Sequence, residues 1–190
     1  MKTYNSDIIN SLNVLGKGGI ILYPTDTVWG IGCDATNVIA IKKIYQIKNR
    51  EEKKSMIILL ANESELEKYV LHPSKKIIDF LFNQTKPTTA IFKNAINLPK
   101  ELVNSDGSIA IRIVKDDFCR ELIERLKKPV VSTSANISGS DSPKKFSDIS
   151  AEIKNGVDYI VQHRQDDLYT AAPSAVIRWN KNGIPTIIRK

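Results

Sequence analysis

The spacing of apolar residues along the chain switches repeatedly between a helical period of about 3.6 and short β-branched runs. This alternation predicts a mixed α/β fold. A first helix is expected over residues 6–15, ending at the glycines of "GKGG", and the following "IILYP" is expected to form a short buried strand. A second helix is expected to begin after Thr36 as its capping residue and to end in "KNR", residues 48–50.

The remaining apolar runs are divided between predicted strands and predicted helices. The strands cover residues 56–60, 88–92, 108–114, 129–134, 158–162, 174–179 and 185–190. The helices lie around residues 63–70, 74–83, 116–127 and 147–154. Because several strands follow one another directly while others are separated by helices, we predict a mixed parallel and antiparallel sheet flanked by helices. The chain shows no internal repeat, low-complexity tract or linker, so we expect one domain over residues 1–190.

The composition is that of a globular protein, with 42% hydrophobic and 26% charged residues in a chain of 190. These values argue against disorder and against a coiled coil. No apolar run approaches membrane-spanning length and the start "MKTYNSDIINSL" lacks a secretory signal, so we expect no membrane association and a cytoplasmic location. Cys33 and Cys119 stand far apart without metal-ligand spacing, so they are interpreted as packing residues.

Charge adds a constraint on partners. Lysine and arginine exceed aspartate and glutamate by 28 to 21, which gives a net charge of +7. Such an excess favours anionic partners such as RNA, DNA or nucleotides, although a solvated basic surface is an equally good interpretation of net charge alone. The local clustering of polar residues therefore has to distinguish a binding site for an anionic partner from a solvated basic surface.

Polar clusters follow the ends of predicted elements, where an α/β sheet usually places its ligand. "YPTDTVWGIGCDA" supplies Thr25, Asp26 and Thr27, and its glycines are expected to let the backbone approach a ligand closely. "KNREEKKS" concentrates basic side chains, Arg112 interrupts the apolar strand "SIAIRIV", and "STSANISGSDSP" provides hydroxyls and an amide. A buried guanidinium needs an anionic or carbonyl partner.

Each cluster also has a purely structural interpretation. The threonines could cap a turn, the basic run could be solvated, Arg112 could pair with a structural acid, and serine-rich loops commonly satisfy their own backbone. Together, however, the clusters describe a basic, hydroxyl-lined pocket suited to a nucleotide. The chain has no phosphate-binding loop, dinucleotide fingerprint or nucleophile elbow, and its only histidines are His72 and His163, so a covalent nucleophile is poorly supported.

In their order and spacing, "YPTDTVWGIGCDA", "KNREEKKS", "SIAIRIV", "STSANISG" and "PTIIRK" resemble the motifs of the YrdC-like threonylcarbamoyl-AMP synthases in their single-domain form. The resemblance spans nearly the whole chain. It implies a twisted mixed sheet with a concave, positively charged cavity. It also implies a reaction in which L-threonine, bicarbonate and ATP give threonylcarbamoyl-AMP and pyrophosphate, the first step towards N6-threonylcarbamoyladenosine at position 37 of tRNA.

The resemblance also implies site residues. The K-x-R and S-x-N signatures of the family match Lys48 with Arg50 and Ser134 with Asn136. The ATP site is expected to comprise Lys48, Arg50, Ser108, Ser134, Asn136, Ser142 and Arg189, with Lys48 and Arg50 catalytic. The L-threonine site is expected to comprise Thr25, Arg112, Ser132 and Ser174. No protein metal site is expected, because Mg²⁺ would be held mainly by the ATP phosphates.

The chemistry is consistent with this residue set. The threonine amine captures CO2 or bicarbonate as a carbamate, whose oxygen then attacks the α-phosphorus of ATP, so no side-chain nucleophile is needed. The protein has to align two anions and stabilise charge on the phosphates, for which Lys48, Arg50 and Lys54 are expected to serve.

The chain departs from the family pattern in three places. Both prolines of the usual K-x-R-P-x-x-K-P-L are replaced in "KNREEKKSM", the loop around Lys86 and Pro87 diverges, and Ala175 replaces the usual threonine in "PSAVI". Two other functions stay open at this point: a basic RNA- or nucleotide-binding module, and a relative that handles a carbamoyl-adenylate with another substrate. In the expected function a tRNA threonylcarbamoyl transferase complex receives the product, and direct tRNA binding is possible.

Overall fold

The protein is described by a computed structural model, which covers residues 4–51, 56–168, 172–180 and 183–189. The α-helices are α1 (Asn5–Gly16), α2 (Val38–Ile47), α3 (Lys75–Phe82), α4 (Asp117–Leu126) and α5 (Ala151–Gly156), with 3-10 helices η1 (Glu63–Lys68) and η2 (Phe146–Asp148). The strands are β1 (Ile21–Tyr23), β2 (Gly30–Gly32), β3 (Ile57–Leu60), β4 (Thr88–Phe92), β5 (Ile109–Ile113), β6 (Val130–Ser134), β7 (Tyr159–Ile160), β8 (Ala175–Trp179) and β9 (Pro185–Arg189).

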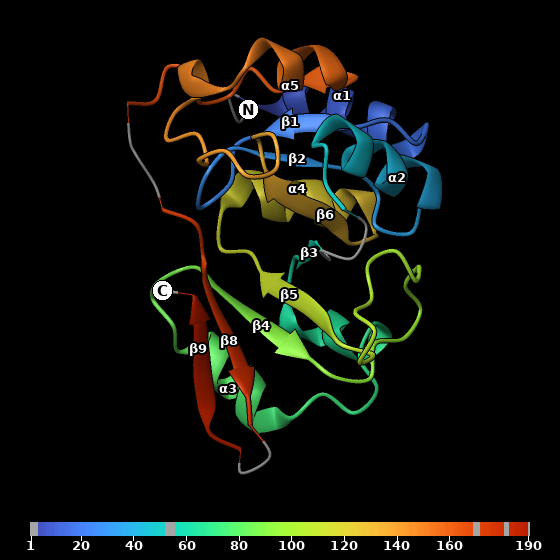
Figure 1. The fold of residues 1–190 in the computed structure, drawn as a ribbon, viewed down its shortest axis with the longest axis vertical. Coiled ribbons are helices and arrows are strands. Elements are labelled where there is room, and N and C mark those ends of the chain that lie inside the picture. The colour runs from blue at the N-terminus through green and yellow to red at the C-terminus, as the bar shows by residue number, and fades with distance from the viewer. Residues whose placement is uncertain (1–3, 52–55, 169–171, 181–182, 190) are drawn as a thin grey trace.

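The strands form one sheet in the order β7-β1-β2-β6-β3-β5-β4-β8-β9. The pairs β1 with β7, β3 with β5 and β4 with β8 are parallel, and the other neighbours are antiparallel. The direction of the strands rotates strongly from β1 to β9 (Figure 1), because the right-handed twist accumulates across a long sheet. The predicted mixed sheet flanked by helices is confirmed.

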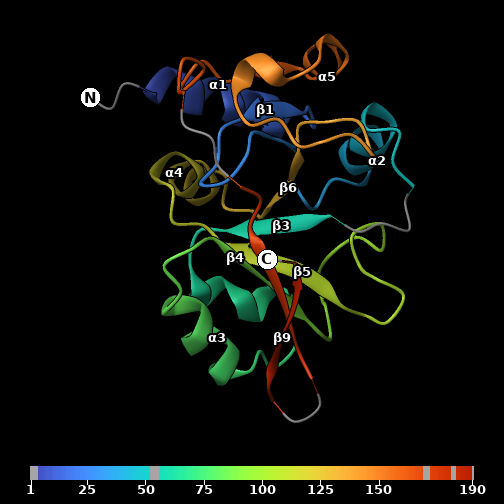
Figure 2. The same cartoon turned by 60° about the vertical axis from the view of Figure 1, so that its left-hand side comes forward.

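The two faces of the sheet carry different helices. Alternate side chains such as Ile58 and Ile111 join the larger core with α2, α3 and α5, whereas Leu59 and Val130 join a smaller core with α1 and α4. This follows from the period of two in a strand, which sends neighbouring side chains to opposite faces. Figure 2 shows α1 and α4 gathered at the β1 end of the sheet. On this face of the sheet, α1 and α4 therefore leave the part towards β8 uncovered.

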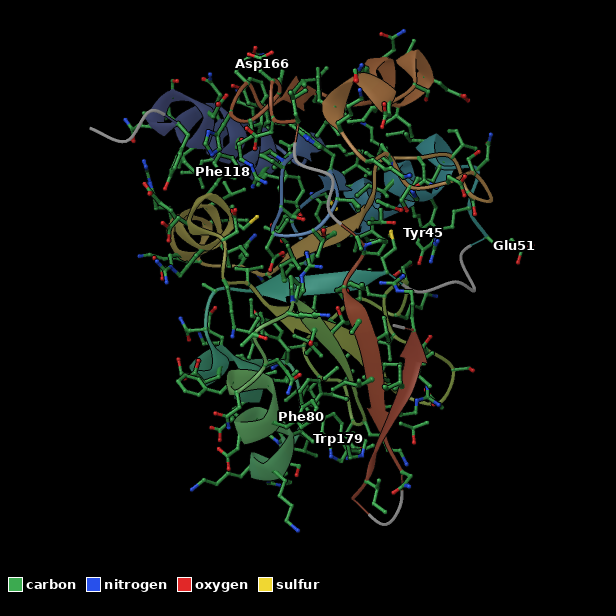
Figure 3. The ribbon with its side chains drawn as sticks, turned by 90° about the vertical axis from the view of Figure 1, so that its left-hand side faces the viewer. Tyr45, Glu51, Phe80, Phe118, Asp166 and Trp179 are labelled. Atoms are coloured by element: carbon green, nitrogen blue, oxygen red, sulfur yellow. The ribbon has the colours of Figure 1, made fainter. Side chains whose placement is uncertain are left out.

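The far end of the sheet is secured from the other face. Phe80 of α3 meets Trp179 of β8 edge to face, with ring centroids 5.2 Å apart (Figure 3). An aromatic pair in this arrangement adds stabilisation beyond the apolar area it buries. It holds β8, and with it the β9 hairpin, against α3.

The second helix differs from its prediction at both ends. Its capping residue is Asn37, whose side chain accepts the amide hydrogen bond of Ala40, while the Thr36 hydroxyl donates to Asp34 instead. The helix ends at Ile47, so its last turn contains no basic residue and Lys48 is the C-terminal cap. The local sequence does not show which of two adjacent polar residues caps a helix, because either side chain can accept a hydrogen bond from the free amides of the first turn.

Strand β2 corrects an expectation, because the sequence pattern predicts that "GIG" belongs to a segment that approaches a ligand and the structure places it inside the sheet. At Gly32 a β-carbon would lie 2.2 Å from the carbonyl oxygen of Val131 and 2.8 Å from Cε1 of Tyr23. Glycine is therefore required there by close packing inside the sheet. Other boundaries shift less: the helix expected at 63–70 is the 3-10 helix η1, and that expected at 147–154 is divided into η2 and α5.

Three further features of the described residues bear on the cysteines, on membrane helices and on metal binding. Cys33 and Cys119 are free and buried, as expected for packing residues. In the described parts of the chain no helix is long and apolar enough to cross a membrane. Among the same residues there is no group of three or more histidine, cysteine, aspartate or glutamate side chains that could hold a metal ion.

Candidate active site

A cavity of about 270 Å³ opens on the α1–α4 face of the sheet, beyond the area that these helices cover. It is lined by Thr27, Val28, Gly30, Arg50, Met56, Ile57, Ala110, Arg112, Ser132, Thr133, Ser134, Ser142, Pro173, Ser174, Val176 and Arg189. Three arginines belong to this lining, and the described residues that form it include no carboxylate. The cavity therefore offers positive charge, hydroxyl groups and an apolar floor.

Strand register explains why residues so far apart in sequence meet here. Ile57 pairs with Ser132 on one side and with Ala110 on the other, and Val176 pairs with Arg189. Paired residues project from the same face of a sheet, and so do residues two apart in one strand. Arg112, two residues after Ala110, consequently projects from the face that carries Ser132.

Arg112 is buried within the β5 strand and is held by two consecutive residues of one turn. Its Nη1 donates to Oγ1 of Thr27 over 3.2 Å, and its Nη2 lies 3.2 Å from Oδ1 of Asp26. The Nε of Arg112 is buried as well but makes no hydrogen bond to the described protein. A buried donor of this kind normally has a partner, so the guanidinium of Arg112, which lines the cavity, keeps one N–H unused.

The turn that holds Arg112 is itself tightly bonded. Oγ1 of Thr25 lies 2.9 Å from both the carbonyl oxygen of Val28 and Oγ1 of Thr27, and it accepts the amide hydrogen bond of Thr27 over 3.0 Å. Thr25 is thus buried behind the lining, whereas Thr27 lines the cavity. The structure places Thr25 as a support for the turn.

The two other arginines of the lining come from distant segments of the chain. Arg50 follows α2, and burial lowers the pKa of its guanidinium. Arg189 stands at the end of β9, where its Nε and Nη2 donate to the carbonyl oxygen of Ser174 over 3.1 and 2.9 Å. The Ser174 hydroxyl lies 2.8 Å from Oγ1 of Thr89. These bonds fix Arg189 and Ser174 as one unit of the wall.

Lys48 and Asn136 lie behind the lining, and both support the loop after β6. The buried Nζ of Lys48 donates to the carbonyl oxygens of Ser134 and Asn136, each over 2.5 Å, and the Lys48 carbonyl accepts from the amide of Ser138. Nδ2 of Asn136 donates to the carbonyl oxygens of Ile137 and Ser140. The K-x-R and S-x-N motifs therefore meet in space, as expected of one site, but Lys48 contacts backbone.

The burial of Lys48 gives a pH-dependent prediction. Desolvation, with a smaller effect of the Arg50 charge, lowers the pKa of Lys48 from 10.5 to about 8. Between these values the unfolded chain holds a proton that the folded chain has released, so the contribution of Lys48 to the free energy of unfolding rises with pH across this window. We expect the free energy of unfolding of the wild type, measured relative to that of Lys48→Met by urea denaturation, to increase between about pH 7.5 and about pH 10. A difference that moves the other way would contradict a lowered pKa.

Ser108 is the predicted site residue that lies elsewhere. Its hydroxyl donates to Oδ1 of Asp106 and accepts from Nδ2 of Asn104, which closes the turn before β5. It lines a separate cavity of about 200 Å³ together with Arg178. A larger cavity of about 650 Å³ between α3 and α4 contains none of the predicted site residues. We therefore assign the candidate active site to the 270 Å³ cavity, where seven of them meet: Arg50, Arg112, Ser132, Ser134, Ser142, Ser174 and Arg189.

The apolar part of the lining was missed at the sequence level. These residues carry no polar signal, and only the tertiary structure shows that they border the cavity: Val28, Met56, Ile57, Ala110 and Val176. The alternation along β6 predicts that the Thr133 side chain turns away from the ligand. Thr133 pairs with Ile31 of the larger core, on the other face of the sheet, and the residue borders the cavity between Ser132 and Ser134. Lys53 and Lys54, the further cations of the basic run, lie outside the described residues.

Comparison with known proteins shows which family the sequence matches. The family model named Sua5_yciO_yrdC, described as "Telomere recombination", matches residues 13–190. A threonylcarbamoyl-AMP synthase of Pseudoalteromonas translucida is 32% identical over 159 residues, which cover 82% of this chain and 85% of that protein. A putative threonylcarbamoyl-AMP synthase of Methanocaldococcus jannaschii is 39% identical over 147 residues, 76% of this chain and 68% of that protein.

A solved structure supports the fold over the whole chain. The structure of P. abyssi Sua5 complexed with L-threonine superposes with a TM-score of 0.85 at 22% identity and covers 100% of this chain. This chain spans 55% of the Sua5 chain. At this identity the likeness establishes the shared fold.

Proposed function

The chain belongs to the Sua5/YciO/YrdC family, and we propose that it synthesises threonylcarbamoyl-AMP from L-threonine, bicarbonate and ATP with release of pyrophosphate. The related proteins that carry this name match most of the chain, and the Sua5 structure of the same fold was obtained with L-threonine. The reaction joins two anions, a carbamate and the α-phosphate of ATP. A site for it must therefore supply positive charge on both sides of the bond that forms.

The unpartnered Nε of Arg112 is the observation that supports this function best. A planar guanidinium binds a carboxylate through two parallel N–H donors. In our proposal Arg112 donates to the threonine carboxylate from Nε and from a second N–H that Thr27 and Asp26 leave unused. The hydroxyls of Ser132 and Ser174 lie in the same lining and would orient the amino acid.

Arg50 and Arg189 would neutralise the phosphates. Both line the cavity. Arg50 is partly buried, so its charge is less screened by water than that of a surface arginine, whereas Arg189 is exposed and is held in place by its hydrogen bonds to Ser174. They would stabilise the charge that develops on the α-phosphate and on the departing pyrophosphate. Mg²⁺ would enter as part of the substrate, bound by the phosphates of ATP.

The adenosine part of ATP is proposed to lie along the loop after β6. Ser134 and Ser142 line the cavity there, and Lys48 and Asn136 hold the loop from behind. At about 270 Å³ the cavity is slightly smaller than the roughly 300–1,000 Å³ of typical ligand pockets. We therefore propose that it receives the threonine and the phosphates, with the nucleoside extending beyond it. A role of Ser108 in ATP binding stays a prediction, because its hydroxyl faces another cavity.

The product is an unstable mixed anhydride, so a tRNA threonylcarbamoyl transferase complex would have to consume it, and we place both steps in the cytoplasm. Direct tRNA binding belongs to the same proposal. A pure RNA-binding module is less well supported, because no aromatic side chain is among the described residues that line the cavity. A relative that handles a different carbamoyl-adenylate would differ in the acceptor amine.

The proposed function can be tested directly by mass spectrometry. We expect the protein to convert L-threonine, bicarbonate and Mg²⁺–ATP into threonylcarbamoyl-AMP, with one pyrophosphate released for each adenylate. L-Serine in place of L-threonine separates threonine specificity from a broader carbamate activity. The proposal fails if neither product appears while a verified threonylcarbamoyl-AMP synthase yields both. Salt-sensitive tRNA binding without turnover would then favour the RNA-binding module.

A further inference from the structure

We propose that Arg164, a residue outside the cavity, is a positioning residue that sets the orientation of Arg112 and thereby the affinity for the amino-acid carboxylate. The inference rests on the proposed function and goes beyond it, because none of the family motifs in the sequence contains Arg164. Arg164 lies in the loop that follows β7, in which Figure 3 labels Asp166. An unbroken series of hydrogen bonds connects this loop to the cavity.

Arg164 connects three segments of the chain. Its Nη1 donates to the carbonyl oxygen of Thr25 over 3.2 Å and to Oδ2 of Asp116 over 3.1 Å, while its Nε donates to Oδ2 of Asp167 over 2.8 Å. Its side chain is 26% exposed and that of Asp116 is 15% exposed, so this pair is partly shielded from water. Such a pair is more rigid and stronger than a fully exposed one.

The carboxylate that holds Arg164 is itself fixed. Oδ1 of Asp116 accepts the amide hydrogen bond of Cys119 over 2.9 Å and caps the N-terminus of α4. The two oxygens of Asp116 thus have separate tasks: one caps the helix and the other binds Arg164. The Cys119 thiol also donates to the carbonyl oxygen of Pro24 over 3.4 Å. Consecutive carbonyl groups, those of Pro24 and Thr25, are therefore held from the side of α4.

The bond to the Thr25 carbonyl acts on the residues that hold Arg112. That carbonyl belongs to the peptide unit joining Thr25 to Asp26, so its orientation decides where Asp26 points. On the other side of the turn, Oγ1 of Thr25 fixes Thr27. Asp26 and Thr27 both contact the guanidinium of Arg112.

This arrangement gives Arg164 a defined effect on binding. Without Arg164, the peptide unit after Thr25 loses one hydrogen-bond donor, and Asp26 and Thr27 gain freedom to move. The Arg112 guanidinium then has to be ordered when the carboxylate binds, which lowers the affinity. The phosphates are contacted from Arg50 and Arg189, which stand on other segments, so ATP binding is affected little.

The test is a double-mutant cycle between Arg164 and Thr27, measured as pyrophosphate release at varied L-threonine and varied ATP. We expect Arg164→Ala to raise the KM for L-threonine about tenfold and to change the KM for ATP less than about twofold. Thr27→Val should raise the KM for L-threonine as well, and the double variant should be no worse than the worse single variant, because both act through Arg112. Arg164→Lys, which can still donate to Thr25 and Asp116, should recover most of the loss.

Two controls separate this role from a general loss of structure. Asp116→Asn keeps the cap on α4 but weakens the bond to Arg164, and it should change the threonine KM in the same direction. Arg120→Ala removes an exposed arginine of α4 that pairs with Asp117, and it should leave both KM values at the wild-type level. Equal increases in both KM values, or additive effects in the cycle, would overturn the proposal.

The inference stays testable if the wild type makes no threonylcarbamoyl-AMP. In that case the proposed function fails. Crystal structures of the wild type, Arg164→Lys and Arg164→Ala then test whether Arg164 positions Arg112. We expect the segment Thr25–Val28 and the Arg112 side chain to shift in Arg164→Ala and to stay in place in Arg164→Lys. An unchanged turn in Arg164→Ala would show that Arg164 does not position Arg112.

Discussion

Replacing Arg112 by alanine is expected to raise the KM for L-threonine about 100-fold, because hydrogen bonds to charged groups contribute about 1.5–3 kcal/mol. The substrate carboxylate would lose its bidentate partner, whereas the phosphates would keep Arg50 and Arg189. The measurement is pyrophosphate release at saturating ATP over a series of L-threonine concentrations. L-Threoninamide, which lacks the carboxylate, provides a second readout: the wild type should strongly prefer L-threonine, and Arg112→Ala should lose this preference.

Stability has to be separated from binding in this variant, since Arg112→Ala also leaves Asp26 without its ion-pair partner. Removing one partner of a buried pair costs about 3–5 kcal/mol. Arg112→Lys restores a positive charge beside Asp26 but lacks the planar fork, so it should recover stability and leave the threonine KM high. Arg178→Ala is a matched control, because Arg178 lies near Asp106 at the other cavity. A lysine variant with wild-type affinity for L-threonine would show that Arg112 has only a structural role.

Replacing Arg50 by alanine is expected to lower kcat about 100-fold, the size of effect seen when one donor to a developing negative charge is removed. Arg50 lines the cavity from the end of α2, and burial reduces the screening of its charge. The KM for L-threonine should change little, because Arg112 and its turn are untouched. Single-turnover measurement of pyrophosphate formation checks whether the chemical step itself is slowed.

The comparison with Lys48 makes this second prediction sharper. Lys48 belongs to the same motif, yet its ammonium is directed at the carbonyl oxygens of Ser134 and Asn136. Lys48→Ala should therefore lower stability and activity together, while Arg50→Ala should lower activity at nearly unchanged stability. Lys43→Ala, which removes a cation from the exposed face of α2, serves as the control for charge alone. The assignment of Arg50 to the phosphates would be wrong if Arg50→Ala and Lys43→Ala had equal kcat.

Some residues of the site can be predicted from the sequence, because they are polar residues that interrupt or directly follow apolar runs. Arg112 interrupts an apolar strand, and "STSANISG" directly follows one, so both stand out in the amino-acid sequence itself. The supporting residues cannot be recognised in this way. Thr25 and Lys48 look like ligand contacts in the sequence, and their buried hydrogen bonds to Val28 and Ser134 place them behind the lining. A side chain's partners depend on contacts between distant segments, which local pattern does not contain.

The sequence by itself determined the class of fold, the strand Thr88–Phe92 to the residue, most other strands to within one or two residues, and the family of the chain. These features depend on local periodicity and on short motifs. Only the tertiary structure decided that Ser108 lines a different cavity, that "GIG" is strand β2, and that Arg164 reaches the turn that holds Arg112. The physical reason is that the register and twist of a mixed sheet arise from long-range pairing, and this pairing selects which of the many polar side chains meet.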